Sequence, residues 1–249
     1  MTLLRVEGLT KEFGGVHAIE GVDFTINPGT IHSIIGPNGA GKTTLFNLIT
    51  GVYVPTRGRI RFEERDIAGR KPAELARLGL SRTFQNLQIF FNMTALENVM
   101  VGHHLHLGRR LLPALLRLPR VVRADRACRE LMEFVGIGRW MEADAASMPY
   151  GALKRLEIAR ALAGRPRLLL LDEPAAGLNA TESREIDAVI QKIAATGVTV
   201  VLVEHDMKMV MGISDHVLVL DGGRKLAEGT PEAVRANPQV VEAYLGAHG

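Results

Sequence analysis

The strongest constraint on this chain is a glycine-rich segment that reads, in order, Gly36, Pro37, Asn38, Gly39, Ala40, Gly41, Lys42, Thr43 and Thr44. Two framing glycines followed by a lysine and a hydroxyl residue satisfy the phosphate-loop pattern. Residues 31–35 before it resemble a short buried strand, and residues 45–49 after it carry apolar side chains at helical spacing. A strand that turns through glycines into a helix directs several backbone N–H groups and the positive end of the helix dipole at one point. We therefore expect the segment to bind a nucleotide β-phosphate, with Lys42 at the β- and γ-phosphates and Thr43 at a magnesium ion.

The length and composition of the chain are those of an ordinary globular protein. Its 249 residues suffice for one large α/β domain or two small ones, and 47% of them are hydrophobic. The single cysteine, Cys128, excludes an internal disulfide framework and is typical of a reducing cytoplasm. We recognise neither a signal peptide nor an apolar run near the ~20 residues that span a bilayer. We therefore expect a soluble chain that reaches a membrane only through a partner.

Alternating apolar and polar side chains predict a β-rich start, and the later half of the chain shows alternating strand and helix patterns. The predicted elements are strands within 2–35 and at 59–62, a helix at 72–80, an amphipathic helix at 153–162, a buried strand at 167–171, a helix at 180–195, a buried strand at 198–203, a hairpin at 216–228 and a C-terminal helix ending at Tyr244. Apolar strands separated by a helix are typical of a parallel sheet buried on both faces. Such a doubly wound α/β fold binds ligands at the carboxyl edge of its sheet.

Residues 86–152 lack strand patterns and are predicted to be helical. Thr94 and Glu97 form a capping-box pattern ahead of a helix at 95–101. The apolar face of a second helix consists of Val121, Ala124, Cys128, Leu131 and Val135. Its opposite face consists of Arg120, Arg123, Arg126 and Arg129. Between His103 and Arg129 seven arginines accompany one acid, Asp125, which fits contact with phospholipid headgroups or an acidic partner as well as a solvated helix face.

Several single residues have no definite role on sequence grounds alone. Phe13 is as consistent with stacking on a purine base as with a place in the core. Gln85 follows a strand-like segment, and solvent exposure is its default interpretation. His103, His104 and His106 have no carboxylate or cysteine nearby in the sequence, which argues against a metal site.

Two acidic residues follow the buried strand at 167–171. Asp172 is placed to hold magnesium directly or through water, and Glu173 to orient and deprotonate an attacking water. His205 follows the next buried strand and is placed to contact a γ-phosphate and link it to Glu173. Taken alone, an acid pair at a strand end can be a solvated turn, and a lone histidine is more often structural. Beside a phosphate loop they favour phosphoryl transfer from ATP, and the absence of an Asn-Lys-x-Asp element argues against guanine nucleotides.

These motifs, in this order, resemble those of ABC-transporter ATPases along essentially the whole chain. The matching positions are the phosphate loop, Gln85, Tyr150-Gly151, 168–173, 176–179 and His205. The chain is similar in particular to the larger ATPase subunit of branched-chain amino-acid importers. The positions that carry this narrower resemblance are 82–86, 97–102, 204–207, 212–215, 229–231 and 244–246.

The resemblance implies an α/β P-loop NTPase fold of ABC type, with a mostly parallel core sheet, an N-terminal antiparallel β part and a helical subdomain. By this resemblance, residues 1–249 form one ATPase domain, with a nucleotide-binding core at 1–85 and 153–249 and a helical subdomain at about 86–152. It also implies ATP and Mg²⁺ as cofactors. Hydrolysis of ATP would then be coupled to transport across a membrane.

The resemblance also implies roles for individual residues. Gln85 would sense magnesium and couple to a membrane subunit, Phe13 would stack on adenine, and His205 would be the switch histidine. Asn179 would lie across a dimer interface, and Tyr150-Gly151 would cap the γ-phosphate of ATP held by the other subunit.

The signature segment departs from the family pattern. The usual Leu-Ser-Gly-Gly-Gln is replaced here by Met148, Pro149, Tyr150, Gly151 and Ala152, without the serine hydroxyl and the glutamine amide. The N–H groups that follow Pro149 are still free to meet a phosphate at a helix start. We therefore expect binding in trans to persist on backbone donors and this half-site to be the less active of two.

The implied partners are transmembrane permease subunits, a second ATPase subunit that is homologous or identical, and indirectly a solute-binding protein, at the cytoplasmic face of the inner membrane. A soluble ABC-type ATPase acting on nucleic acid or ribosomes is the alternative, prompted by the arginines and a sequence pI near 9.2. Such proteins usually fuse two cassettes or add long insertions, whereas this chain has one phosphate loop, so no nucleic acid is expected. A non-hydrolysing regulator is disfavoured by the intact Asp172-Glu173 pair. The amino-acid substrate rests on the resemblance alone.

Overall fold

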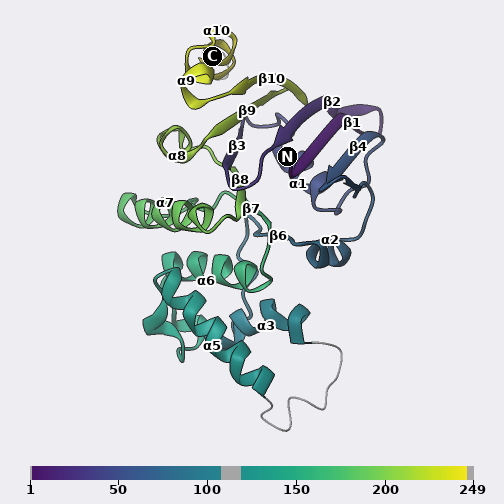
Figure 1. The fold of residues 1–249 in the computed structure, drawn as a ribbon. Helices are drawn as coiled ribbons and strands as arrows, with labels where there is room; N and C mark the ends of the chain where they lie inside the picture. The colour runs from purple at the N-terminus through teal and green to yellow at the C-terminus, as the bar shows by residue number, and fades with distance from the viewer. Residues whose placement is uncertain (1, 108–118, 246–249) are drawn as a thin grey trace.

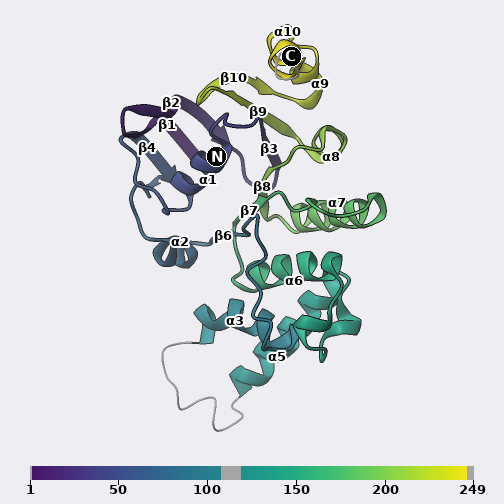
Figure 2. The same ribbon diagram turned by 180° about the vertical axis from the view of Figure 1, so that it is seen from behind.

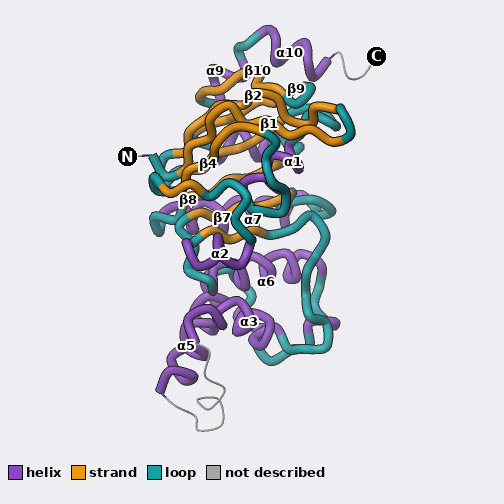
Figure 3. Tube along the Cα trace, turned by 90° about the vertical axis from the view of Figure 1, so that its right-hand side faces the viewer, coloured by secondary structure: helices purple, strands orange, loops and turns teal. Residues whose placement is uncertain are grey.

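The computed structural model describes residues 2–107 and 119–245. Its β-sheets lie in one half of the molecule and a group of helices lies in the other (Figure 1). The C-terminal helices lie at the end of the molecule opposite to that helical group, beyond the sheets (Figures 1 and 3).

A six-stranded sheet forms the centre of the fold. Its strands, in spatial order, are β10 (Arg224–Gly229), β9 (His216–Asp221), β3 (Ile31–Ile35), β8 (Thr199–Val203), β7 (Leu168–Asp172) and β6 (Leu80–Arg82). The strands from β9 to β6 run parallel, and β10 pairs antiparallel with β9. Every residue of β3, β7 and β8 is buried, which agrees with their uninterrupted apolar character.

A four-stranded antiparallel sheet packs beside the central one. Its order is β2 (Val16–Ile26), β1 (Leu4–Phe13), β4 (Arg57–Phe62) and β5 (Arg65–Asp66). Helix α1 (Lys42–Ile49) joins the two sheets, because Phe46 of α1 belongs to one buried cluster with Leu4, Ile60 and Leu170. The phosphate-loop helix is therefore held in a rigid apolar core.

Helices α6 (Tyr150–Ala163) and α7 (Ala180–Ala195) cover the other face of the central sheet. Helices α3 (Ala95–Leu107) and α5 (Pro119–Phe134) pack on α6 and extend this helical layer away from the sheet. Leu169 and Leu171 of β7 pack against this layer, whereas Leu168 and Leu170 pack on the α1 side. Successive residues of one strand thus enter two separate cores. Helix α6 lies between the sheet and the pair formed by α3 and α5 (Figures 2 and 3).

The predicted elements are observed with small differences in their bounds. Helix α2 (Pro72–Leu78) ends two residues earlier than predicted, because Gly79 adopts a left-handed φ of 93° and Leu80 begins β6. The short C-terminal helix predicted to end at Tyr244 is α10 (Pro238–Leu245), and a further helix, α9 (Pro231–Arg235), precedes it. A proline disfavours helical geometry in the residue before it, which explains the break ahead of Pro238.

Further short elements complete the fold. They are α8 (Met207–Ile213) and 3₁₀ turns at Gly138–Trp140 and Ala145–Ser147. The capping box predicted for α3 is present: the Thr94 backbone N–H donates to Glu97 Oε2 at 2.8 Å, and the Glu97 N–H donates to Thr94 Oγ1 at 3.2 Å. Within the two described ranges, no helix is both long and apolar enough to cross a membrane.

Candidate functional site

The glycine-rich segment connects β3 to α1 in a conformation that only glycine fits at two points. Gly36 and Gly41 have φ values of 154° and 96°. A Cβ atom on Gly41 would lie 2.5 Å from the Ala18 carbonyl oxygen, and one on Gly36 would lie 2.2 Å from that of Leu220. Gly41 is the N-cap of α1 and has no side chain to satisfy the first N–H groups of the helix. These groups therefore remain donors for an anion.

Lys42, the first residue of α1, is directed back at the loop. Its Nζ donates to the carbonyl oxygens of Gly36 at 2.7 Å and Pro37 at 3.0 Å. Burial lowers the pKa of the Lys42 ammonium, and the negative charge of Glu173 opposes that shift. The lysine charge is thus held inside the loop, close to a carboxylate on another element.

A cavity of about 240 Å³ lies over the loop. It is lined by Ala18, residues 38–44, Gln85, Glu173 and His205. Gln85, Glu173 and His205 each follow a different parallel strand, β6, β7 and β8. The carboxyl ends of these strands bring together residues that lie far apart in the sequence, as expected for a doubly wound sheet.

Glu173 is held from two sides. Its Oε1 lies 2.8 Å from His205 Nε2, and its Oε2 accepts a hydrogen bond from Gln85 Nε2 at 2.9 Å. The sequence predicted the link between His205 and Glu173. The backbone of Glu173 is left-handed, with φ 48°, and its N–H donates to the Val203 carbonyl at 3.0 Å. A carboxylate fixed in this way is able to orient a water molecule and accept its proton.

Lys154 of α6 connects the helical layer to this site. Its residue surface is only 2% exposed, and Nζ lies 3.3 Å from the Glu173 carbonyl oxygen and 3.4 Å from that of Gln85. Sequence reasoning placed Lys154 on an amphipathic helix without a role. Lysine is seldom buried, so its burial would have pointed to a role for Lys154 in the site. The sequence pattern of a helix does not show whether one polar residue in it is buried.

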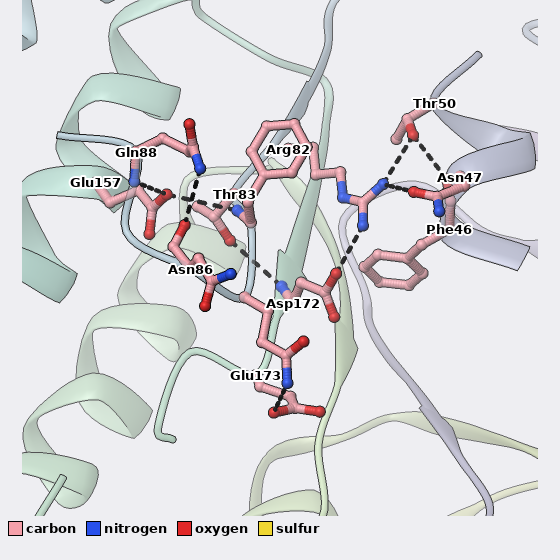
Figure 4. A network of polar contacts seen from close by, with 12 residues as sticks. Phe46, Asn47, Thr50, Arg82, Thr83, Asn86, Gln88, Glu157, Asp172 and Glu173 are labelled. Carbon is pink, nitrogen blue, oxygen red and sulfur yellow. Dashed lines mark hydrogen bonds and ion pairs between the residues drawn. The ribbon is translucent and has the colours of Figure 1, made fainter. Parts of the chain in front are cut away.

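Asp172, the last residue of β7 and the neighbour of Glu173, is not among the described residues that line the cavity. It is 4% exposed, and its Oδ2 accepts from Arg82 Nη2 at 2.6 Å (Figure 4). The Asp172 N–H donates to Thr83 Oγ1 at 3.3 Å. The pairing with Arg82 was missed from the sequence, because contacts between residues 90 positions apart leave no local pattern.

Phe13 lies at the end of β1 with its side chain exposed. Its ring packs edge-on against Tyr53, with ring centres 5.2 Å apart, and Lys11 Nζ lies 4.8 Å from its centre. Phe13 is not among the described residues that line the cavity. Its stacking on a base stays a prediction.

Tyr150 and Asn179 lie on the surface, outside the cavity lining. Pro149 is the N-cap of α6, so Tyr150 and Gly151 are its first two residues, and the helix begins three residues before Leu153, where the sequence predicted its start. Tyr150 is 45% exposed and lies against Gly177, where an added Cβ would be 3.2 Å from the tyrosine ring. Asn179 caps α7 through a capping box with Glu182. The trans roles of these residues stay predictions.

The available donors suit magnesium and a triphosphate. Thr43 is exposed at the start of α1. The hydroxyl of Thr43, the amide oxygen of Gln85 and the carboxylate of Asp172 are hard oxygen ligands of the kind Mg²⁺ accepts. Groups of three or more His, Cys, Asp or Glu side chains that could hold a metal are absent from the described residues. One carboxylate suffices for Mg²⁺, because this ion keeps several waters and binds substrate phosphates.

The arginine-rich region is only partly described. Arg126 pairs with Glu130 at 2.9 Å, and Arg129 pairs with Asp125 at 2.9 Å and Glu142 at 2.8 Å. Arg123 is exposed. The side chains of Arg109, Arg110, Arg117 and Arg120 and of His104 and His106 lie outside the described residues. His103 is buried, with Nδ1 3.2 Å from the Ala163 carbonyl oxygen, which gives it a structural place.

Comparison with known proteins places this geometry in a family. The sequence profile described as ABC transporter matches residues 19–176, and one described as branched-chain amino acid ATP-binding cassette transporter matches residues 224–249. The high-affinity branched-chain amino acid transport ATP-binding protein BraF of Pseudomonas aeruginosa is 47% identical over 249 residues, covering 98% of each chain.

Two solved structures are similar over nearly their whole length. The ADP conformation of MJ1267, an ATP-binding cassette of an ABC transporter, has a TM-score of 0.88 and 35% identity, covering 99% of each chain. The dimeric, post-hydrolysis ATP-binding cassette MJ0796 bound to ADP and Pi has a TM-score of 0.75 and 25% identity, covering 92% of this chain and 98% of that one. The phosphate loop, the residues gathered over it and these matches agree, and the chain belongs to the ABC transporter family as one of its ATP-binding cassettes.

Proposed function

We propose that this chain binds and hydrolyses ATP to energise a membrane importer of branched-chain or other hydrophobic amino acids. The observation that carries hydrolysis is the placement of Glu173, which is held by Gln85 and His205 beside the phosphate loop. The amino-acid substrate is supported by the likeness to BraF over 98% of both chains.

The residues around the cavity divide the chemistry between them. Lys42, Thr44 and the N–H groups of residues 38–44 bind the phosphates. Glu173 accepts the proton of the attacking water, and His205, 2.8 Å from that carboxylate, contacts the γ-phosphate. Thr43, Gln85 and Asp172 are the residues that would hold Mg²⁺, which neutralises phosphate charge when bound.

A second ATPase subunit completes the site. Tyr150, Gly151 and Asn179 lie outside the cavity of their own chain, yet Tyr150 and Gly151 offer the free N–H groups of a helix start. These groups cap the γ-phosphate of ATP bound to a facing subunit. The similarity to MJ0796, whose structure is a dimer, supports this arrangement. Adenine stacks on the exposed ring of Phe13.

The permease contacts a groove between the core and the helical layer. A cavity of about 570 Å³ lies between α2, the segment 84–90, α3 and α6, and its lining includes the exposed rings of Phe84 and Phe90. Residues 86–152 form a helical subdomain that supplies one wall, and residues 1–85 and 153–249 form the core. In this arrangement Gln85 follows Phe84 of the groove and donates a hydrogen bond to Glu173, so it adjoins both. The protein binds the permease at the cytoplasmic face of the inner membrane.

Two variants test the proposal. Glu173→Gln keeps the size of the side chain and removes the base, so ATP hydrolysis should be lost while ATP still binds. Lys42→Ala should instead weaken nucleotide binding. Hydrolysis at the normal rate in Glu173→Gln, or unchanged ATP affinity in Lys42→Ala, would contradict these roles. Purification of the tagged protein from its native membrane with its permease, and uptake of labelled leucine by that complex in vesicles, tests the transport assignment.

A further inference from the structure

The Arg82 side chain is a buried junction between three parts of the molecule. Nη2 donates to Asp172 Oδ2 at 2.6 Å, and Nη1 donates to Asn47 Oδ1 at 2.5 Å and Thr50 Oγ1 at 3.1 Å (Figure 4). The side chains of Arg82 and Asp172 are only 7% and 5% exposed. The guanidinium carbon also lies 5.5 Å from the ring centre of Phe46 and 5.0 Å from that of Phe84.

This set of contacts requires an arginine. A planar guanidinium donates in several fixed directions at once and packs against aromatic faces, whereas a lysine ammonium is a single point charge. Within the described residues Nε has no acceptor, so the contacts that Arg82 makes run through its two terminal nitrogens. One of these nitrogens binds β7 and the other binds α1.

The acceptors on α1 share a helix face with a proposed magnesium ligand. Thr43 and Asn47 lie four residues apart in α1, and Thr50, the C-cap of that helix, lies three residues further on, so the three share one side of the helix. Arg82 holds Asn47 and Thr50 with one nitrogen and Asp172 with the other. It therefore fixes α1, which carries Thr43, relative to β7, which carries Asp172.

We propose that Arg82 is a positioning residue for magnesium binding, because it sets the separation of Thr43 and Asp172 and the rotation of the Asp172 carboxylate. The inference rests on the proposed function, in which these two residues hold Mg²⁺ with ATP. Arg82 itself contacts neither metal nor nucleotide. Outer residues that orient metal ligands typically change metal affinity by about 10- to 100-fold when they are replaced.

Arg82→Lys is the decisive variant, because it retains the positive charge beside Asp172 and loses the fork that reaches α1. Binding of Mn²⁺, as a paramagnetic substitute for Mg²⁺, is measured by electron paramagnetic resonance with the full-length protein and a non-hydrolysable ATP analogue. We expect Mn²⁺ affinity to fall by about tenfold or more. Affinity for the analogue in EDTA should stay within about twofold, since the loop itself is unchanged. Arg129→Lys, which alters an arginine paired with two carboxylates on α5, is the matched control and should leave both affinities unchanged.

Asn47→Ala provides a second test should Arg82→Lys fail to fold. It removes one acceptor of Arg82 and leaves the Arg82–Asp172 pair intact, so a smaller loss of Mn²⁺ affinity in the same direction is expected. Unchanged Mn²⁺ affinity in a folded Arg82→Lys protein, or in Asn47→Ala where that is the measurable variant, overturns the inference. If the unmodified protein fails to bind the analogue at all, the proposed function fails instead, so the two failures are distinguishable.

Discussion

The stability of this protein should depend on pH through a buried histidine pair away from the ATP cavity. His32 of β3 is 8% exposed and stacks on His216 of β9, with ring centres 5.4 Å apart. Burial, aided by the charge of His216, lowers the pKa of His32 from 6.5 to about 4, against an opposing effect of Asp215. Glu228 of β10 is the other charged group that lines the same small cavity.

The sign and size of the effect follow from this pKa. Below pH 6.5 the unfolded chain takes up a proton at His32, whereas the folded chain does not until about pH 4. The stability that the neutral ring provides is therefore complete above pH 6.5 and is lost as the pH falls towards 4. The unfolded chain binds a proton at His32 between pH 7 and pH 5 and the folded chain does not, and this difference lowers the free energy of unfolding by about 2 kcal/mol over that range.

Two variants isolate this contribution. His32→Phe keeps a ring against His216, His32→Gln keeps polarity, and neither can take up a proton. Urea unfolding at pH 7 and pH 5 should show that both variants lose about 2 kcal/mol less between these pH values than the unmodified protein does. The same loss in all three proteins would refute the reasoning, because the pH dependence would then come from other groups.

Three further substitutions have defined outcomes. Gly41→Ala should abolish binding of a fluorescent ATP analogue, because the new Cβ would lie 2.5 Å from the Ala18 carbonyl and displace the loop; retained affinity would contradict this. Asn179→Ala removes the acceptor at the start of α7 and should lower the free energy of unfolding by about 1 kcal/mol in urea. Lys154→Met keeps the buried stem and removes the ammonium that holds the carbonyls of Gln85 and Glu173. It should lower kcat for ATP hydrolysis by about tenfold, or ~1.4 kcal/mol, with unchanged ATP affinity, and an unchanged kcat would exclude a supporting role.

The fold and the outline of the site were predictable because both depend on local pattern. The strand, loop and helix at 31–49 are recognisable from glycine spacing and apolar periodicity. Parallel strands place the residues that follow them at one edge, which brought Glu173 and His205 together as expected. Gln85 joins them there, which only the family resemblance had indicated. The side-chain contacts across the fold were not predictable. The pairing of Arg82 with Asp172, the burial of Lys154 and the stack of His32 on His216 depend on how distant elements pack, and no spacing in the sequence encodes them.

The backbone of Glu173 provides a test of what its conformation costs. A left-handed φ of 48° costs a non-glycine residue about 1–2 kcal/mol, and the hydrogen bonds of Glu173 to Val203, Gln85 and His205 offset that cost. Glu173→Ala removes the side-chain bonds and keeps the strain, whereas Glu173→Gly removes both. Glu173→Gly should therefore be more stable than Glu173→Ala by about 1 kcal/mol in urea unfolding, although at an ordinary position glycine is the less stable of the two. If alanine proves equally stable or more so, Glu173 is not strained, and its conformation is an ordinary feature of the turn rather than one imposed by the site.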